Sequence, residues 1–117
     1  MGMAVLEETL LRPVGSPTDC ATKLAVLADA TRLAVLEVLL AGPRNVKQIN
    51  QSVGIAQNLL SHHLRVLREA GLVSARRVGK GVLYALAEGV GAGRSHQSLN
   101  LGCCKLTFQD PPLGGKR

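Results

Sequence analysis

The chain is poor in aromatic residues: its 117 residues include one Tyr, one Phe and no Trp. Domains that bind RNA or single-stranded nucleic acid commonly stack bases on aromatic rings, so this scarcity argues against those classes. It also means that a core must be built from Leu, Val and Ala. Hydrophobic residues make up 46% of the chain, which is enough for such a core, and the length suits a single domain.

Long apolar runs are also missing. No stretch approaches the roughly 20 residues that a membrane-spanning helix needs. The first residues include Glu7 and Glu8 and lack the apolar centre of a secretory signal. We therefore expect a cytoplasmic protein without membrane contact, in which the three cysteines are thiols rather than a disulfide framework.

Acidic residues are few, with 8 Asp and Glu against 14 Lys and Arg, which gives a net charge of +6. The imbalance lies mainly in residues 41–80, where seven basic residues accompany a single acid, Glu69. A basic segment of this kind is typical of proteins that contact the phosphate backbone of nucleic acids. A charged surface that serves only solubility is the alternative interpretation.

Apolar periodicity predicts four helices in the first 70 residues. The first is expected over residues 20–28 with Thr18 or Asp19 as its cap, and the second begins at Asp29 or Thr31 and ends before residues 41–43. The other two are expected over residues 45–52, capped by Asn45, and over residues 56–70.

After residue 71 the pattern changes to short segments typical of strands, residues 72–77 and 82–87, which residues 78–81 join as a hairpin. The fold class is therefore mainly α with a small β-hairpin. We expect three regions: an N-terminal arm over residues 1–17, one domain over residues 18–88 and a tail over residues 89–117. The Gly- and Ser-rich start of the tail is expected to be a flexible connector.

The helices at 45–52 and 56–70 are separated by a short turn with Gly54, an arrangement that lets the second helix enter a DNA major groove. Its polar face and the hairpin supply the candidate DNA contacts, which are Gln57, Asn58, Ser61, His62, Arg65, Arg68, Arg76, Arg77 and Lys80. The alternative is a helical hairpin with a solvated polar face. Neighbouring helical residues point about 100° apart, so His62 and His63 form a poor chelating pair, with one expected at the surface and the other partly packed.

Two segments resemble motifs of the ArsR/SmtB metalloregulators. They are Leu-Ala-Asp-Ala-Thr-Arg-Leu at residues 27–33 and the run from Ser-His-His-Leu to Ala-Gly-Leu-Val at residues 61–73. The resemblance covers about residues 20–87 and implies a homodimeric winged helix-turn-helix repressor that leaves its operator on binding a metal or metalloid. It also implies that the candidate helix residues contact DNA and that Arg76, Arg77 and Lys80 belong to the wing.

The cysteines indicate the effector. Residues 45–52 contain no cysteine, so the sensor site that some members carry on that helix is absent, and His96 and Asp110 are too few for a carboxylate–histidine zinc site. What remains is the adjacent pair Cys103 and Cys104, with the distant Cys20. Neighbouring thiolates suit a thiophilic centre, so we expect arsenite or antimonite as effector and no constitutive cofactor.

The tail resembles the arsenic-responsive members of the family, which carry a C-terminal cysteine pair. In the family the first helix packs at the dimer interface, so Cys20 can complete the site from its own or from the partner subunit. Cys20 as a small core residue is the plainer interpretation. Two other effectors remain open: a redox or persulfide signal acting on the same thiols, and cadmium or zinc bound by cysteines with His96.

No enzyme is expected from this sequence. Residues 89–93 contain three glycines at alternate positions, but Arg94 stands where a dinucleotide-binding loop needs glycine and no βαβ unit surrounds the segment. No nucleophile has a base at a plausible position. Two other classes remain open, a DNA binder with little sequence preference and a protein–protein adaptor with a winged-helix fold.

Overall fold

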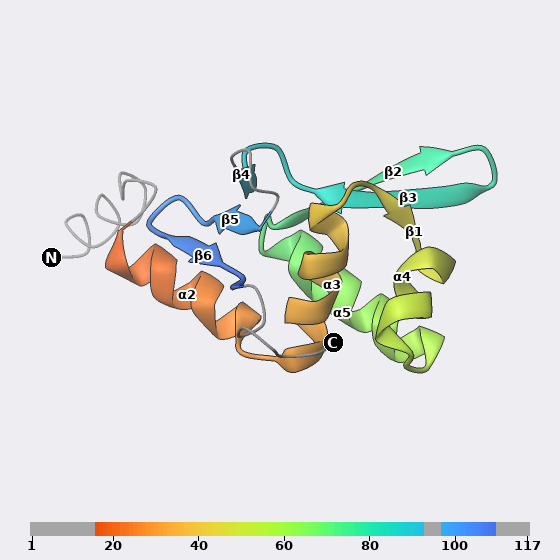
Figure 1. The fold of residues 1–117 in the computed structure, drawn as a ribbon, viewed down its shortest axis with the longest axis horizontal. Coiled ribbons are helices and arrows are strands. Elements are labelled where there is room, and N and C mark those ends of the chain that lie inside the picture. Colours follow the sequence, from red (N-terminus) through yellow and green to blue (C-terminus); the bar gives the residue numbers. More distant parts are fainter. Residues whose placement is uncertain (1–15, 93–96, 110–117) are drawn as a thin grey trace, which may run out of the picture.

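The computed structural model describes residues 16–92 and 97–109 of the chain. Its helices are α2 (Pro17–Leu27), α3 (Ala30–Leu40), α4 (Val46–Val53) and α5 (Gln57–Glu69). Its strands are β1 (Arg44–Asn45), β2 (Val73–Val78), β3 (Gly81–Leu86), β4 (Gly91–Ala92), β5 (Ser98–Asn100) and β6 (Lys105–Thr107). Figure 1 shows α3 and α5 in the middle, with α2 on one side, α4 on the other and the β2–β3 hairpin extending above α4.

The predicted fold class is confirmed: helices precede a helix-turn-helix and a β-hairpin, in the arrangement of a winged helix. The first helix begins earlier than expected. Its cap is Ser16, whose hydroxyl accepts from the backbone N–H of Asp19 at 3.1 Å, rather than Thr18 or Asp19. Pro17 follows the cap because its fixed φ suits the first helical position.

Asp29 caps α3, one of the two predicted starts. Its carboxylate accepts from the backbone N–H of Arg32 at 3.0 Å. This bond holds the pKa of the Asp29 carboxyl below its usual value, and the nearby side chains of His63 and Arg32 act in the same direction against the effect of burial. The charged form of Asp29 is therefore the one that the folded chain stabilises.

The turn between α4 and α5 is held by a side chain from within α4. Asn50 donates to the carbonyl of Ile55 at 2.6 Å and accepts from the N–H of Ile55 at 2.9 Å. Between them Gly54 adopts φ 71°, a left-handed conformation that glycine enters without steric cost. Asn45 caps α4, as predicted, in a capping box with Gln48.

One face of α5 is buried against the other helices. Leu60, Leu64 and Leu67 are almost inaccessible to solvent, at helical spacing, and His63 lies beside them with only 8% of its surface exposed. They join a core that also includes Leu36 and other apolar side chains of α3 and α4. Because this face is occupied, the opposite face of α5 is presented to solvent.

The predicted hairpin is confirmed, with β2 and β3 paired antiparallel and the turn at Val78–Gly81. A third strand was not predicted. β1 consists of only two residues and pairs with β3 through Arg44 opposite Tyr84 and Asn45 opposite Leu83. This pairing ties the base of the hairpin to the segment that leads into α4.

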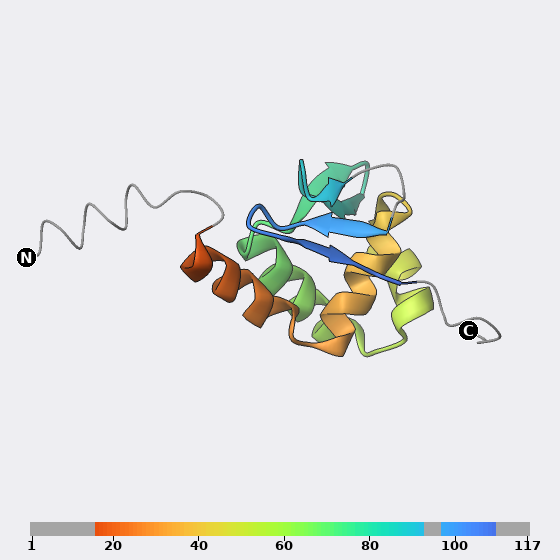
Figure 2. The same cartoon turned by 60° about the vertical axis from the view of Figure 1, so that its left-hand side comes forward.

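The tail differs most from expectation. The segment expected to be a flexible connector contains β4, and the described tail forms a second antiparallel sheet in the order β4-β5-β6. Val90, Leu99 and Leu101 are buried in the same core as the helices. In Figures 1 and 2 β5 and β6 run alongside α2. The described part of residues 89–109 contains no helix, and residues 1–15, 93–96 and 110–117 lie outside the described ranges.

In residues 16–92 and 97–109, no helix combines the length and apolar character that crossing a membrane requires.

Replacing Asn50 with Ala removes both hydrogen bonds across the turn. We expect Asn50→Ala to lower the free energy of unfolding by about 1–3 kcal/mol, since each bond contributes roughly 0.5–1.5 kcal/mol. Urea denaturation followed by circular dichroism measures the change. Gln51→Ala, an exposed neighbour on the same helix, is the control, and equal losses in the two variants would contradict this role of Asn50.

The lowered pKa of Asp29 predicts a stability contribution that is present above the unfolded-state pKa and is lost as the pH falls through the folded-state pKa. Asp29→Asn keeps the cap but has no charge. We expect the stability advantage of the wild type over Asp29→Asn to shrink between pH 5 and about pH 2. Urea denaturation of both proteins across this range measures the advantage, and a pH-independent difference would rule out the charge as its cause.

Candidate nucleic-acid interface and thiol cluster

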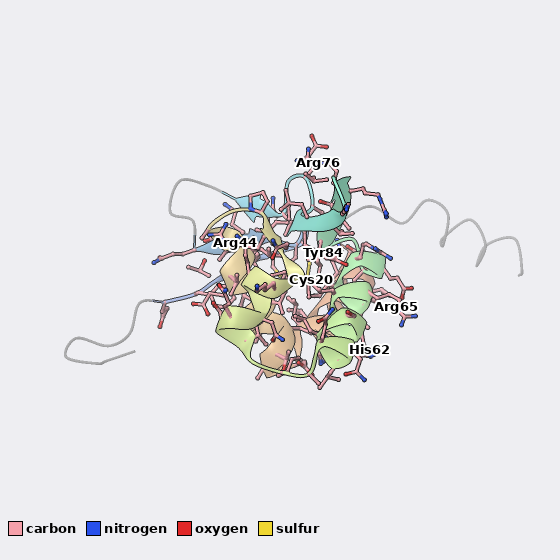
Figure 3. All side chains as sticks on the ribbon, turned by 90° about the vertical axis from the view of Figure 1, so that its right-hand side faces the viewer. Cys20, Arg44, His62, Arg65, Arg76 and Tyr84 are labelled. Carbon is pink, nitrogen blue, oxygen red and sulfur yellow. A yellow bond between two sulfur atoms is a disulfide. The ribbon has the colours of Figure 1, made fainter. Side chains whose placement is uncertain are left out.

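The structure presents all the predicted DNA-contact side chains to solvent. The residues on α5 are Gln57, Asn58, Ser61, His62, Arg65 and Arg68, and those on the hairpin are Arg76, Arg77 and Lys80. Figure 3 shows His62 and Arg65 projecting from the outer side of α5, with Arg76 on the hairpin beyond them. The helix α5 and the hairpin strand β2 are neighbours, and their exposed polar and basic residues together are called the basic face below.

An open groove of about 450 Å³ lies between α4 and the start of α5. Its lining consists of Val46, Lys47, Asn50 and Gln51 of α4 together with Gln57 of α5. Lys47 and Gln51 are four residues apart and share one side of α4. Neither residue is among the predicted DNA contacts, although their spacing on the polar side of a short helix is visible in the sequence.

Arg76 and Arg77 occupy successive positions in β2, opposite Leu83 and Val82 of β3. Successive side chains of a strand point to opposite faces. The two arginines therefore project from opposite sides of the hairpin ribbon, and a DNA backbone lying against one side meets only one of them directly.

The two adjacent histidines have different environments. His62 is exposed, whereas His63 is buried and its Nδ1 accepts from the Nε of Arg32 at 3.1 Å. Arg32 also donates from Nη1 to the carbonyl of Val26 at 3.0 Å. The expectation of one surface and one packed histidine is confirmed. The contact with Arg32 could not be predicted, because the two residues lie 31 positions apart.

The three cysteines meet at one place. Their sulfur atoms all lie within 4.8 Å of one another, and no His, Asp or Glu of the described residues joins the group. Sγ of Cys104 lies 3.4 Å from Sγ of Cys20 and 3.7 Å from Sγ of Cys103. Cys20 comes from the first turn of α2 and the other two from the turn between β5 and β6, so one chain supplies all three.

The turn that carries Cys103 and Cys104 is ordered by backbone contacts. The N–H of Leu101 donates to the carbonyl of Cys104 at 2.9 Å, and the side chain of Asn100 accepts from the N–H of Gly102 at 3.0 Å. Gly102 has φ 91°, which few other residues adopt. The neighbouring sulfur atoms therefore sit on a turn of defined shape.

A covalent bond and a hydrogen bond attach this turn to α2. Cys20 and Cys103 form a disulfide, and Nζ of Lys23 donates to the carbonyl of Leu101 at 3.0 Å. The disulfide corrects the expectation that all three cysteines are thiols: the fold brings residues 83 positions apart within bonding distance, a proximity that the sequence alone did not reveal. Cys104 is the free cysteine and is exposed.

The donor set of the cluster is sulfur alone. Soft thiolate ligands select thiophilic centres, whereas hard cations prefer oxygen ligands. The set fits a centre bound by up to three thiolates once the disulfide is reduced. His96 and Asp110, the other ligands considered from the sequence, lie outside the described residues.

Comparison with known proteins identifies relatives of the middle of the chain. A profile of the family "Bacterial regulatory protein, arsR family" matches residues 29–75. The "HTH-type transcriptional regulator NmtR" of Mycobacterium tuberculosis is 41% identical over 66 residues, 56% of this chain and 55% of the relative. The "Probable mercury resistance operon repressor" of Streptomyces lividans is 38% identical over 76 residues, 65% of this chain and 61% of the relative. This chain therefore spans less than two thirds of these two relatives.

A solved structure extends the similarity to three dimensions. It is the homodimeric winged helix-turn-helix DNA-binding domain of a Mycobacterium bovis protein, named as a possible ArsR-family transcriptional regulator. It matches with a TM-score of 0.59 and 32% sequence identity, over 63% of this chain and 68% of that one. The fold, the helix-turn-helix sequence and these relatives agree: the chain belongs to the ArsR family of bacterial regulatory proteins.

Proposed function

We propose that this protein is a homodimeric repressor that binds double-stranded operator DNA through its basic face and releases it when arsenite or antimonite binds Cys20, Cys103 and Cys104. The observation that carries the proposal is the convergence of the three sulfur atoms within 4.8 Å. The relatives support a regulatory rather than an enzymatic role, since one is named as a mercury resistance operon repressor.

The DNA-binding part rests on the basic face. Phosphate contacts by Arg and Lys supply affinity and orientation, while hydrogen bonds to base edges supply specificity. Arg65 and Arg68 are suited to the first task, and Asn58 and Ser61 to the second. A two-fold symmetric dimer would place two copies of α5 about one helical turn of DNA apart. The homodimeric relative supports this assembly.

The sensing part rests on thiol chemistry. Trivalent arsenic enters as arsenous acid, and each thiol that binds it forms one sulfur–arsenic bond and releases one water molecule. Two of the three sulfurs are joined in the disulfide, so a reductant must first deliver two electrons and two protons to Cys20 and Cys103. Because all three sulfurs belong to one chain, each protomer offers a complete site.

A second candidate signal is oxidation itself. The Cys20–Cys103 disulfide joins α2 to the tail and can be made or broken by thiol–disulfide exchange. In that case the protein is a thiol-redox or persulfide-responsive repressor of the same fold. The two signals are distinguished by comparing disulfide and dithiol forms without any metalloid. Cadmium or zinc bound by the cysteines with His96 is a further candidate effector, which titration of the reduced protein with these ions would test.

The basic face predicts salt-dependent DNA binding. We expect Arg65→Gln to weaken binding to a duplex selected from a randomised library and to reduce the slope of log Kd against log salt by about 1. Fluorescence anisotropy of the reduced protein at several salt concentrations measures both quantities. Lys105→Gln, which removes the same charge from β6 in the second sheet, should leave the slope unchanged. Equal slopes in Arg65→Gln and the wild type would remove α5 from the proposed interface.

The thiol cluster predicts one arsenite per chain in protein reduced with a phosphine, which unlike a dithiol does not compete for arsenic. We expect Cys20→Ser, Cys103→Ser and Cys104→Ser each to weaken arsenite binding at least tenfold, because each loses one of three ligands. Thiolate-to-arsenic absorption in the near ultraviolet reports binding, and anisotropy reports release of the selected duplex.

The control for this experiment is Ser98→Ala, which changes a residue of the neighbouring strand and no sulfur. Wild-type affinity in all three cysteine variants would contradict the proposed site. If DNA affinity changes between the disulfide and dithiol forms but not with arsenite, the redox interpretation replaces the metalloid one.

A further inference from the structure

Arg32 stands where three helices meet. It belongs to the first turn of α3 and its guanidinium donates two hydrogen bonds to other helices. Nη1 reaches the carbonyl of Val26 in the last turn of α2 at 3.0 Å, and Nε reaches Nδ1 of His63 on α5 at 3.1 Å. One rigid, planar group therefore fixes the end of α2 relative to the middle of the helix that carries the basic face.

α2 buries little of its own surface. Leu27 is its one buried residue, and the exposed Leu24 leaves 45% of its surface in solvent. At its N-terminal end α2 is tied to the tail through Cys20 and Lys23, and at its C-terminal end through Val26 to Arg32. The helix is thus attached at both of its ends, and the thiol cluster contributes the attachment at the N-terminal end.

A helix as short as α2 can transmit a displacement of Cys20 near one end to Val26 near the other. Cys20 and Val26 are six residues apart, which corresponds to about 9 Å along the axis at 1.5 Å per residue. Opening the Cys20–Cys103 bond and holding three sulfurs around one centre changes where Cys20 sits relative to the tail. Since the hydrogen-bonded ladder of the helix is stiff, the change tilts α2 as a unit and moves the Val26 carbonyl that Arg32 contacts.

The other hydrogen bond of the Arg32 guanidinium is donated to His63 of α5. His63 is buried, so its ring position is set by packing and by the Arg32 bond. The preceding residue, His62, lies on the basic face. A shift of the guanidinium therefore acts on α5 from its buried side, directly behind the residues proposed to contact DNA.

We infer that Arg32 is a positioning residue that transmits the state of the thiol cluster to α5 by hydrogen bonding to Val26 and His63. The inference rests on the proposed function, because it supplies the physical connection between the sulfur site and the basic face. Arg32 touches neither DNA nor the effector. Its contribution is to the coupling between two binding events rather than to either affinity.

Coupling is measured as the ratio of DNA Kd values with and without saturating arsenite, using the duplex selected against the reduced wild type. Typical coupling corresponds to a factor of roughly 5–150. We expect this factor in the wild type and a ratio within about twofold of 1 in Arg32→Met, which keeps the length of the stem but donates to neither partner. Arsenite affinity of the DNA-free protein should be unchanged in Arg32→Met.

Two substitutions of His63 separate the hydrogen bond from simple packing. His63→Asn retains an acceptor close to the position of Nδ1, whereas His63→Leu fills the space without an acceptor. We expect coupling to survive in His63→Asn and to be lost in His63→Leu. Arg44→Met is the matched arginine control, because Arg44 donates only to the adjacent carbonyl of Pro43 among its contacts in residues 16–92 and 97–109.

The outcomes distinguish this inference from the proposed function. Wild-type coupling in both Arg32→Met and His63→Leu would overturn the inference and leave the proposed function standing. If Arg32→Met fails to fold, the two His63 variants test the inference instead. Equal coupling in His63→Asn and His63→Leu would then reject the role of the Arg32–His63 hydrogen bond. A wild-type protein whose DNA affinity responds neither to arsenite nor to disulfide reduction would overturn both.

Discussion

The buried stripe of Leu60, Leu64 and Leu67 on α5 is the constraint on which the rest of the arrangement depends. These side chains fill the space between α5 and the neighbouring helices, and their removal from water is the main force that holds α5 to the body. Because a helix has only one such stripe here, the polar residues at the remaining positions are turned outward together. The outward orientation of the α5 residues in the basic face is thus a consequence of how the core is filled.

Much of the helical part could be predicted from the sequence, because it depends on local features. The sequence predicts Asn45 as a cap and Asp29 as one of two possible starts of its helix, since a side-chain acceptor followed by apolar residues at helical spacing is a local pattern. The hairpin was predicted for the same reason, from alternation on both sides of a short glycine-containing turn. The exposed face of α5 followed from the position of its apolar stripe.

The tail could not be predicted in the same way. β4 and β5 have only two or three residues each, which is too short for any periodicity to be seen, and the segment is rich in glycine and serine. Its strands exist because Leu99 and Leu101 are buried in the helical core, and that contact is not local in sequence. The Cys20–Cys103 bond and the Arg32–His63 contact were hidden for the same reason: each joins residues that only the folded chain brings together.

The Cys20–Cys103 bond closes a ring that encloses nearly the whole winged helix, since α3, α4, α5 and the β2–β3 hairpin all lie between its two ends. A ring of this size restricts the unfolded chain by an amount that the loop-entropy relation puts at about 4–5 kcal/mol. In the oxidised form, a protease that cuts once between these cysteines leaves two pieces still covalently joined. The nicked molecule migrates as two fragments only after a reductant is added.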